Sequence, residues 1–170
     1  MAFHNRMTST VFVLTDGSRC LVREAVASDV ESIVALLVDD PLGATRESSD
    51  DIAAYRAAFE DISSDPRNLQ VVVVHEDIVV ATLQSTVIPG LARAGALRAQ
   101  IEGVRVAAAW RGRGLGAALI GWAVAAAERQ GCALVQLTSD ASRVDAQRFY
   151  TRLGFTASHV GFKKQLGTTT

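Results

Sequence analysis

The sequence predicts a mixed α/β fold in which one sheet is covered by helices on both faces. Residues 69–88 are rich in β-branched side chains and are divided by a polar turn at residues 75–77. Two segments in the first half repeat apolar residues at helical spacing. From residue 99 onward, strand and helix patterns alternate, which is typical of a sheet with helices packed against it.

The first part of the chain predicts a hairpin followed by two helices. Residues 11–25 contain two β-rich runs joined by Asp16-Gly17, a pair suited to a tight turn. Ser28-Asp29-Val30-Glu31 has the pattern of a capping box and leads into an amphipathic helix. A second amphipathic helix follows Ser48-Ser49 and is expected to end at Asp65-Pro66.

The second part predicts strands and helices in turn. Gly103 lies inside a strand pattern and indicates a bulge or a close approach of another backbone. Gly131 and Gly154 are expected to end two helices. The predicted elements are, in order, a strand pair over residues 69–88, a loop over 89–97, a strand over 99–106, a helix over 114–129, a strand over 133–138, a helix over 145–153 and a last strand near 155–162.

Composition excludes several classes of protein. The 170 residues are 49% hydrophobic, which suits one globular domain, and 17 basic against 18 acidic residues give no global field for a nucleic acid or a membrane surface. Cys20 and Cys132 have no metal-like spacing and are expected to be reduced core residues. The first ten residues lack the apolar run of a secretory signal, and no apolar stretch reaches about 20 residues. We therefore expect a cytoplasmic protein with no metal cofactor, no membrane segment and no nucleic-acid partner.

An arginine- and glycine-rich turn between a strand and a helix is the most informative segment, VRVAAAWRGRGLGAAL over residues 104–119. Its glycines, at positions 112, 114 and 116, leave backbone amides free to face a phosphate at the positive end of the helix dipole. Arg111 and Arg113 add positive charge. The segment predicts a phosphate site, although similar turns also begin helices that bind nothing.

A dinucleotide site is a second interpretation of the same residues. Residues 112–117 fit G-x-G-x-x-G/A, and Asp140 follows the next predicted strand. In a dinucleotide-binding fold, however, the glycine turn follows the strand at once and lies near the start of the domain, whereas here residues 107–111 intervene. A nicotinamide-dependent oxidoreductase stays as an alternative. The G-x-x-x-x-G-K-[ST] loop is absent, which argues against ATP or GTP hydrolysis.

The loop resembles the coenzyme A loop of the GNAT superfamily of N-acetyltransferases, Q/R-x-x-G-x-G/A. Residues 111–116 match every specified position of that pattern. A second family element, a short helix with an aromatic pair and Gly-Phe, resembles residues 149–155, FYTRLGF, about 35 residues later. The resemblance covers about residues 20–165. It implies a mostly antiparallel sheet of about six or seven strands flanked by about four helices, in one domain over residues 1–170.

The resemblance also implies acetyl-CoA as the cosubstrate and a position for each part of it. The backbone of Val104 and Val106 would pair with the pantetheine arm like an added strand. One departure concerns Arg143, which stands where family members often have Asn, so the usual side-chain contact to the arm is in doubt. The residues whose amides would hold the pyrophosphate are Arg111, Gly112, Arg113, Gly114, Leu115, Gly116 and Ala117.

Acetyl transfer to an amine needs a base for the ammonium, a donor for the thioester oxygen and an acid for the thiolate. Tyr150 matches the family's position for the acid, and Glu102 matches a glutamate that serves as base directly or through water. Glu102 would otherwise balance Arg98 or Arg105 or lie at the solvated edge of the strand opening, and Tyr150 would otherwise be an aromatic packing residue. His159 and Asp140 stay as substitutes for the base. The amide of Val106 is the candidate for polarising the thioester carbonyl.

The acceptor is expected to be a primary amine of a small molecule or peptide, acetylated by direct transfer in a ternary complex. The predicted loop over residues 39–47 and the start of the second helix are locally acidic, which suits a cationic or polyamine-like acceptor or simply stabilises the helix. The acidic residues are Asp39, Asp40, Glu47, Asp50 and Asp51. A non-catalytic acyl-CoA sensor is the other alternative, and many family members are homodimers.

Overall fold

The computed structural model describes residues 9–39 and 51–166. The chain divides into two compact units, residues 1–137 and 138–170, and each is described here by itself. The prediction of one domain over residues 1–170 stays a prediction. The regular elements of the first unit are β1 (Thr10–Val13), β2 (Arg19–Glu24), η1 (Ala27–Asp29), α1 (Val30–Val38), α2 (Ile52–Ser64), β3 (Asn68–His75), β4 (Ile78–Ile88), α3 (Ala92–Gly95), β5 (Leu97–Val106), η4 (Ala108–Trp110), α4 (Leu115–Arg129) and β6 (Cys132–Leu137).

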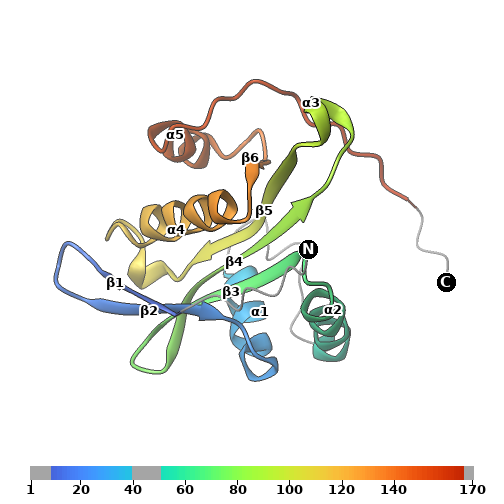
Figure 1. Ribbon diagram of the computed structural model, residues 1–170. Coiled ribbons are helices and arrows are strands. Elements are labelled where there is room, and N and C mark those ends of the chain that lie inside the picture. Colours follow the sequence, from blue (N-terminus) through green and yellow to red (C-terminus); the bar gives the residue numbers. More distant parts are fainter. Residues whose placement is uncertain (1–8, 40–50, 167–170) are drawn as a thin grey trace. The chain divides into compact units, whose positions relative to one another are not determined.

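Within the described residues, the strands form one six-stranded sheet in the order β1-β2-β3-β4-β5-β6 (Figure 1). Neighbouring strands are antiparallel except β5 and β6, which are parallel because α4 connects them. The predicted α/β class with a mostly antiparallel sheet is confirmed. Both predicted hairpins, β1–β2 and β3–β4, are present.

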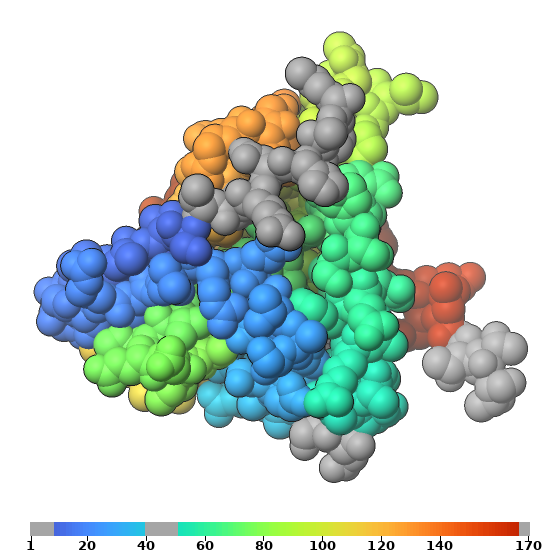
Figure 2. Space-filling model, turned by 60° about the horizontal axis from the view of Figure 1, so that its bottom comes forward, coloured from blue at the N-terminus to red at the C-terminus, as the bar shows by residue number. Residues whose placement is uncertain are grey.

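Helices cover both faces of the sheet, as the sequence predicts. Figure 1 shows α1 and α2 on one side of the strands and α4 on the other. Figure 2 shows α1 and α2 side by side on their face. Three consecutive residues of β3, Val71 to Val73, are each fully buried, and consecutive strand residues point to opposite faces. The centre of the sheet is therefore packed on both sides.

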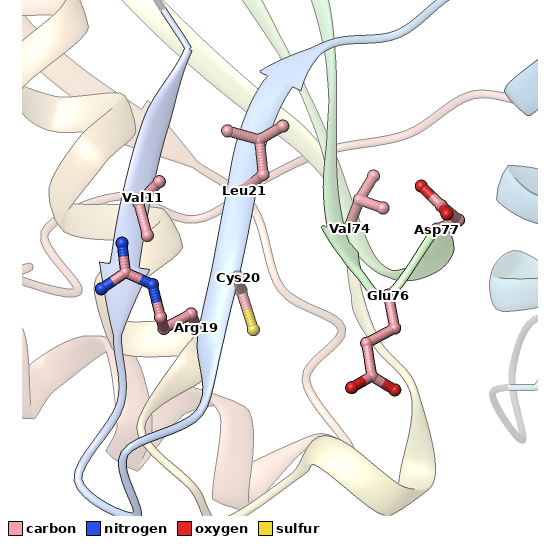
Figure 3. A pocket seen from close by; sticks show the side chains of 7 residues that line it. All are labelled: Val11, Arg19, Cys20, Leu21, Val74, Glu76 and Asp77. Carbon is pink, nitrogen blue, oxygen red and sulfur yellow. The ribbon is translucent and has the colours of Figure 1, made fainter.

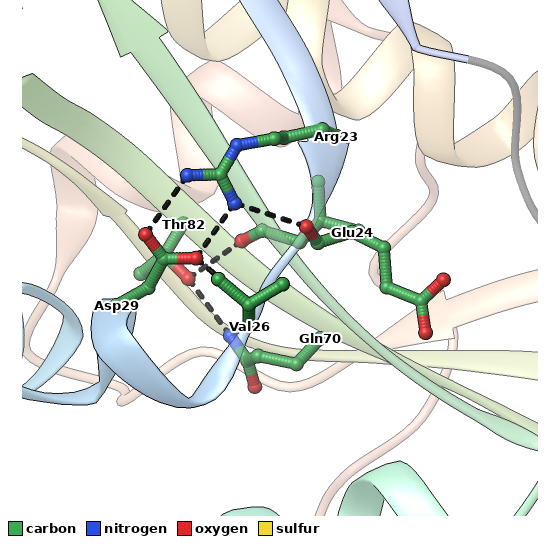
Figure 4. A network of polar contacts seen from close by, with 7 residues as sticks. Arg23, Glu24, Val26, Asp29, Gln70 and Thr82 are labelled. Carbon is green, nitrogen blue, oxygen red and sulfur yellow. Dashed lines mark hydrogen bonds and ion pairs between the residues drawn. The ribbon is translucent and has the colours of Figure 1, made fainter. Parts of the chain in front are cut away.

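The start of α1 differs from the predicted capping box. The Ser28 side chain makes no cap, and Asp29 takes the role one residue later by accepting a hydrogen bond from the Val26 amide at 2.8 Å. Both carboxylate oxygens of Asp29 also accept from Arg23 on β2, at 2.6 and 2.9 Å (Figure 4). The interacting side chain is thus Asp29, which accepts from the amide three residues before it and from Arg23 on the preceding strand.

Asp29 is a buried carboxylate, with 6% of its surface exposed. Burial raises the pKa of this group, but the hydrogen bonds from Arg23 and Val26 outweigh burial, so the pKa lies below its usual value. Beside it, the buried Thr82 hydroxyl donates to the Val71 carbonyl at 2.7 Å and accepts from Gln70 at 2.8 Å (Figure 4). The Asp29 group joins the start of α1 to β2, the Thr82 group joins β4 to β3, and the hydrogen bonding of both is satisfied.

The second unit contains α5 (Val144–Arg152), close to the predicted helix over residues 145–153. The last strand predicted near residues 155–162 is wrong, because the described chain after Gly154 has no regular structure. Val160 and Phe162 in that segment are largely exposed. A strand needs a neighbouring strand for its backbone hydrogen bonds, and the residue types of this segment do not indicate one.

Two smaller expectations concern the cysteines and the membrane. Cys20 is buried as expected, whereas Cys132 is only half-buried, and burial raises the pKa of both free thiols. Across residues 9–39 and 51–166, no helix has the length and apolarity to cross a bilayer.

Candidate functional site

The C-terminal half of β5 has a free edge. Among the described strands, β6 pairs with β5 from Leu97 to Ile101 and ends there, at Leu137, while β5 continues to Val106 with only β4 beside it. A strand edge presents unpaired amides and carbonyls to which another extended chain can bind. The edge over residues 102–106, called the open edge below, leads directly into the predicted phosphate loop.

A bulge shapes the open edge, as Gly103 indicated. The register pairs Gln84 with Glu102 and Thr82 with Arg105, so Gly103 and Val104 together face the single residue Leu83. A bulge of this kind increases local twist and re-aims the strand. Here it lies where β5 leaves the paired part of the sheet.

The carbonyls of Val104 and Val106 lie on the open edge. The amide of Ala107 donates to the Val80 carbonyl of β4 at 2.9 Å, so the preceding residue turns its polar groups away from β4. The Val106 carbonyl accepts instead from Arg111 Nε at 2.9 Å. The Val104 carbonyl accepts from Arg105 Nη1, also at 2.9 Å. Arginine side chains therefore donate to both carbonyls.

The phosphate loop ends at a helix whose first amides have no side-chain cap. Gly114 is the N-cap residue of α4 and has φ of 86°, and Gly112 has φ of 75°. Both values lie in the left-handed region, which residues with a Cβ adopt at a cost. The first amides of a helix lack intrahelical partners, so those of Leu115, Gly116 and Ala117 face the loop at the positive end of the dipole.

The two arginines of the loop are bound to carboxylates. Arg111 Nη2 lies 3.4 Å from a carboxylate oxygen of Asp39, just beyond α1, and both side chains are about half exposed. Arg113 Nε donates to Asp16 of the β1–β2 turn at 2.7 Å. Gly112 therefore lies between two residues whose side chains are both bound to carboxylates.

Glu102 lies on the face of the sheet that also carries α1 and α2. Residues paired across antiparallel strands share a face, so Glu102 lies with Gln84, and Arg105 lies with Thr82. Ile101, which precedes Glu102, points to the other face and is buried. Within the described chain, no ion pair links Glu102 to an arginine, so the alternative that it balances Arg98 or Arg105 lacks support. Its side chain is exposed, which fits the alternative that it lies at the solvated edge of the strand opening.

Around Glu102, this face is lined with amide and hydroxyl groups. Gln136 donates to Gln100 at 2.7 Å, linking β6 to β5. On β3 and β4, Asn68 accepts from Thr86 at 2.6 Å. The residues that the register places on this face include Asn68, Gln84, Thr86, Arg98, Gln100, Glu102, Arg105 and Gln136. These eight residues offer one carboxylate, two guanidinium groups and several neutral hydrogen-bonding groups.

Tyr150 belongs to the second unit and lies in α5, half-buried. Its ring meets Phe149 and Phe155 edge to face, with centroids 5.2 and 5.9 Å apart. This aromatic packing positions the phenol ring within its unit. In the same unit, Asp140 accepts from the backbone and hydroxyl of Ser142 ahead of α5, and the exposed His159 contacts Ser158, so both substitutes for the base have local structural partners.

The acidic region is described only in part. Asp39 pairs with Arg111, and Asp51 caps α2 by accepting from the Ala54 amide at 3.2 Å. For Asp51 the helix-stabilising interpretation is therefore confirmed. Asp40, Glu47 and Asp50, with most of the predicted loop over residues 39–47, lie outside the described residues.

A separate hollow of about 240 Å³ lies on β1, β2 and the end of β3 (Figure 3). None of the predicted site residues lines it, and we assign it no role. Its lining consists of Val11, Arg19, Cys20, Leu21, Val74, Glu76 and Asp77. Elsewhere in the described ranges, no three His, Cys, Asp or Glu side chains gather in a way suited to a metal ion.

Comparison with known proteins decides the family. A model of the acetyltransferase (GNAT) family matches residues 30–155. The chain belongs to this family. It is an acetyltransferase, and the family assignment sets aside the dinucleotide interpretation of the glycine loop.

Relatives of this acetyltransferase share most of its length. The aminoalkylphosphonate N-acetyltransferase of Salmonella typhimurium is 29% identical over 147 residues, which cover 86% of this chain and 92% of the relative. A transcriptional regulator from Bacillus halodurans is 44% identical with a TM-score of 0.83, over 85% of this chain and 98% of that one. A putative acetyltransferase from Agrobacterium tumefaciens is 27% identical with a TM-score of 0.73, over 85% and 99%.

Sequence reasoning missed the partners of the acetyltransferase's loop. Asp16 was interpreted only as a turn residue, and Trp110 carried no signal. The contact between Asp16 and Arg113 joins residues 97 apart in sequence, which no local pattern reports. Trp110 lies three residues before Arg113, and its contact with the guanidinium is local.

Proposed function

We propose that this acetyltransferase transfers an acetyl group from acetyl-CoA to the primary amine of a small molecule or peptide, directly, in a ternary complex. The observation that carries the proposal is the open edge of β5 running into the glycine loop and the uncapped start of α4. An open strand edge can pair with an extended arm, and the glycine loop and helix N-terminus that follow it can bind the pyrophosphate joined to that arm.

The pantetheine arm would bind along the open edge. The backbone of Val104 and Val106 would pair with its amides, which would replace the guanidinium donors of Arg105 and Arg111. Released from Val106, Arg111 would be available to the phosphates. The amides of residues 111–117 would hold the pyrophosphate.

The proton transfers would use the two residues that the sequence indicated, Glu102 and Tyr150. Glu102 would take the proton of the acceptor's ammonium, directly or through water, and Tyr150 would give a proton to the sulfur of coenzyme A. The Val106 amide would polarise the thioester carbonyl. What supports Glu102 is its place on the polar face next to the open edge, without an ion-pair partner in the described chain.

Aminoalkylphosphonates are the first acceptors to test. The Salmonella relative is named for this class, and Arg98 and Arg105 lie on the same face as Glu102, where guanidinium groups suit a phosphonate. The acidic region motivates polyamines as the comparison. Preference for the phosphonate would support recognition by the arginines, and preference for the polyamine would support recognition by the acidic residues.

Thermal unfolding with acetyl-CoA tests the cosubstrate first. Ligand at about 100 times its Kd adds about 2.7 kcal/mol, which raises Tm by about 5–10 °C for a chain of this size. NAD and ATP are the controls. A shift with NAD alone, or none with acetyl-CoA, would contradict the proposal. A shift with acetyl-CoA but no thiol release with any amine would favour the sensor.

Two substitutions test the chemistry once an acceptor is found. Glu102→Gln and Tyr150→Phe are each expected to lower kcat by about 10²–10⁴-fold, the usual contribution of a general base or acid. Acetyl-CoA affinity should stay the same. Glu128→Gln and Tyr55→Phe are the matched controls, since they make the same changes elsewhere in the chain. A kcat unchanged in Tyr150→Phe would remove this residue from the mechanism.

A further inference from the structure

The phosphate loop crosses the ends of several strands and contacts each in turn. Ala107 bonds to Val80 of β4, and the ring of Trp110 packs on His75 at the end of β3, with centroids 4.7 Å apart. Arg113 then reaches the β1–β2 turn. The shape of the loop therefore depends on residues far from it in the sequence.

The guanidinium of Arg113 is held on three sides. It donates to Asp16 from Nε at 2.7 Å and also from Nη2, and Nη2 donates to the Ser18 hydroxyl at 2.9 Å. Its face lies over the Trp110 ring, with Cζ 4.1 Å from the centroid. Because both the N–H donors and the planar face of this guanidinium are engaged, it is held in one orientation.

Asp16 is itself fixed. Its other oxygen, Oδ1, accepts from the Ser18 amide at 2.9 Å, and Gly17 completes the turn through its bond to the Leu14 carbonyl. The Ser18 amide and the Arg113 guanidinium lower the pKa of Asp16 to about 2. The carboxylate is thus charged at neutral pH and presents Oδ2 to the loop from a rigid turn.

We propose that Asp16 is a positioning residue for coenzyme A binding: by clamping Arg113 against Trp110, it holds the amides of the glycine loop in the conformation that receives the pyrophosphate. Arg113 on this account acts as a tether, and the phosphates meet backbone amides and Arg111. The inference rests on the proposed function. It adds a residue of the first hairpin that belongs to no part of the loop motif.

A double-mutant cycle separates a tether from a direct phosphate contact. If Asp16 and Arg113 act together, Asp16→Ala and Arg113→Ala each raise the Kd of acetyl-CoA about tenfold, through lost preorganisation, and the double variant is no worse than either. If Arg113 instead binds phosphate, Asp16→Ala leaves the Kd unchanged or lowers it, because the guanidinium is released. That second result would overturn the proposal.

The conservative variant Arg113→Lys sharpens the cycle. A lysine keeps the charge but lacks the planar fork, so it cannot bond Asp16 and Ser18 while stacking on Trp110. We expect its Kd to match that of Arg113→Ala. A wild-type Kd in Arg113→Lys would show that charge alone is needed and would overturn the tether.

Asp65→Ala is the matched control. Asp65 forms the same kind of turn and binds Arg67 through Nε at 3.1 Å and Nη2 at 3.0 Å, but it joins residues only two apart. Its removal should leave the Kd at the wild-type value. An equal rise of Kd in Asp65→Ala and Asp16→Ala would show a general effect of losing a surface pair and would contradict the positioning role.

Trp110 fluorescence tests the clamp without any ligand. In a Trp122→Phe background Trp110 is the remaining tryptophan, and Asp16→Ala should change its emission because the stacked guanidinium is released. If wild-type protein does not bind acetyl-CoA, the proposed function fails, and the emission still judges the clamp. Unchanged emission in Asp16→Ala would overturn it in either case.

Discussion

Two aspartate–arginine pairs tie the first hairpin to the rest of the first unit, and they differ in burial. Asp29 and Arg23 join β2 to the start of α1, with the carboxylate buried beneath the helix. Asp16 and Arg113 join the hairpin turn to the phosphate loop, and more than a third of each of these two side chains is exposed to solvent. The same kind of ion pair therefore stabilises the packing of α1 in one place and contacts the glycine loop in the other.

The contrast follows from what happens to the remaining charge when one partner of each pair is removed. A buried carboxylate and its partner become unsatisfied when either is removed, so the cost falls on folding. When one member of an exposed pair is removed, water solvates the other, so stability changes little. What is lost is the local conformation that the pair maintained. For Asp16 that geometry belongs to the loop.

Asp29→Ala should show the largest effect on stability. The change leaves the guanidinium of Arg23 and the amide of Val26 without their acceptor, and the free energy of unfolding should fall by about 3–5 kcal/mol. Urea unfolding followed by circular dichroism measures it. Asp16→Ala, measured beside it, should leave the urea midpoint close to wild type. Equal losses in the two variants would break the comparison.

Acid unfolding sharpens the same contrast. Because the folded-state pKa of Asp29 is lowered, this carboxylate contributes stability above the unfolded-state pKa of about 3.9, and that stability is lost as pH falls through the folded-state value. The free energy of unfolding should therefore decline below about pH 4. Asn at this position cannot be protonated in that range, so Asp29→Asn should show a shallower decline. Parallel curves for the two proteins would exclude Asp29 as a source of acid sensitivity.

Gly114→Ala tests the loop through its backbone. A Cβ at this position meets no atom within 4 Å, so the cost of the change is the left-handed φ of 86°. We expect a loss of about 1–2 kcal/mol in the free energy of unfolding, together with weaker acetyl-CoA binding. Gly121→Ala is the control, since Gly121 lies inside α4 with open space around it, and alanine there should stabilise by about 0.5–1 kcal/mol. Destabilisation by both variants would show that φ is not the cause.

Asp51→Ala should have the smallest effect. Its carboxylate caps α2 and is exposed, so its loss should cost about 1 kcal/mol of stability with no change in kcat. A large fall in kcat or a rise in the acceptor's KM would instead give Asp51 the substrate-recruiting role that the acidic region suggested.

The sequence predicted those parts of the fold that depend on neighbours along the chain. The Asp16-Gly17 turn, the strand pair around residues 75–77 and the helix after Gly114 were all found from local spacing. The failures were of another kind. A strand was predicted near residues 155–162, but strand formation needs a partner edge, and the residue types of a segment carry no information about one.

The candidate site was predictable to the same extent. The glycine loop and the strand before it were evident from residue types whose chemistry is local, and the place of Glu102 beside the open edge agrees with its proposed role. The contacts that the Arg111 and Arg113 guanidinium groups make were not predictable. Their partners, Asp39 and Asp16, lie 72 and 97 residues away and are common surface residues.

The bulge at Gly103 and Val104 has a consequence for comparing this enzyme with its relatives. Before the bulge, even-numbered residues such as Glu102 share the polar face, and after it the odd-numbered Arg105 does. An alignment to a homologue whose strand is regular must therefore contain a one-residue gap at this point. Without the gap, either the glutamate or the arginine is equated with a neighbour on the opposite face, and its role is transferred to the wrong residue.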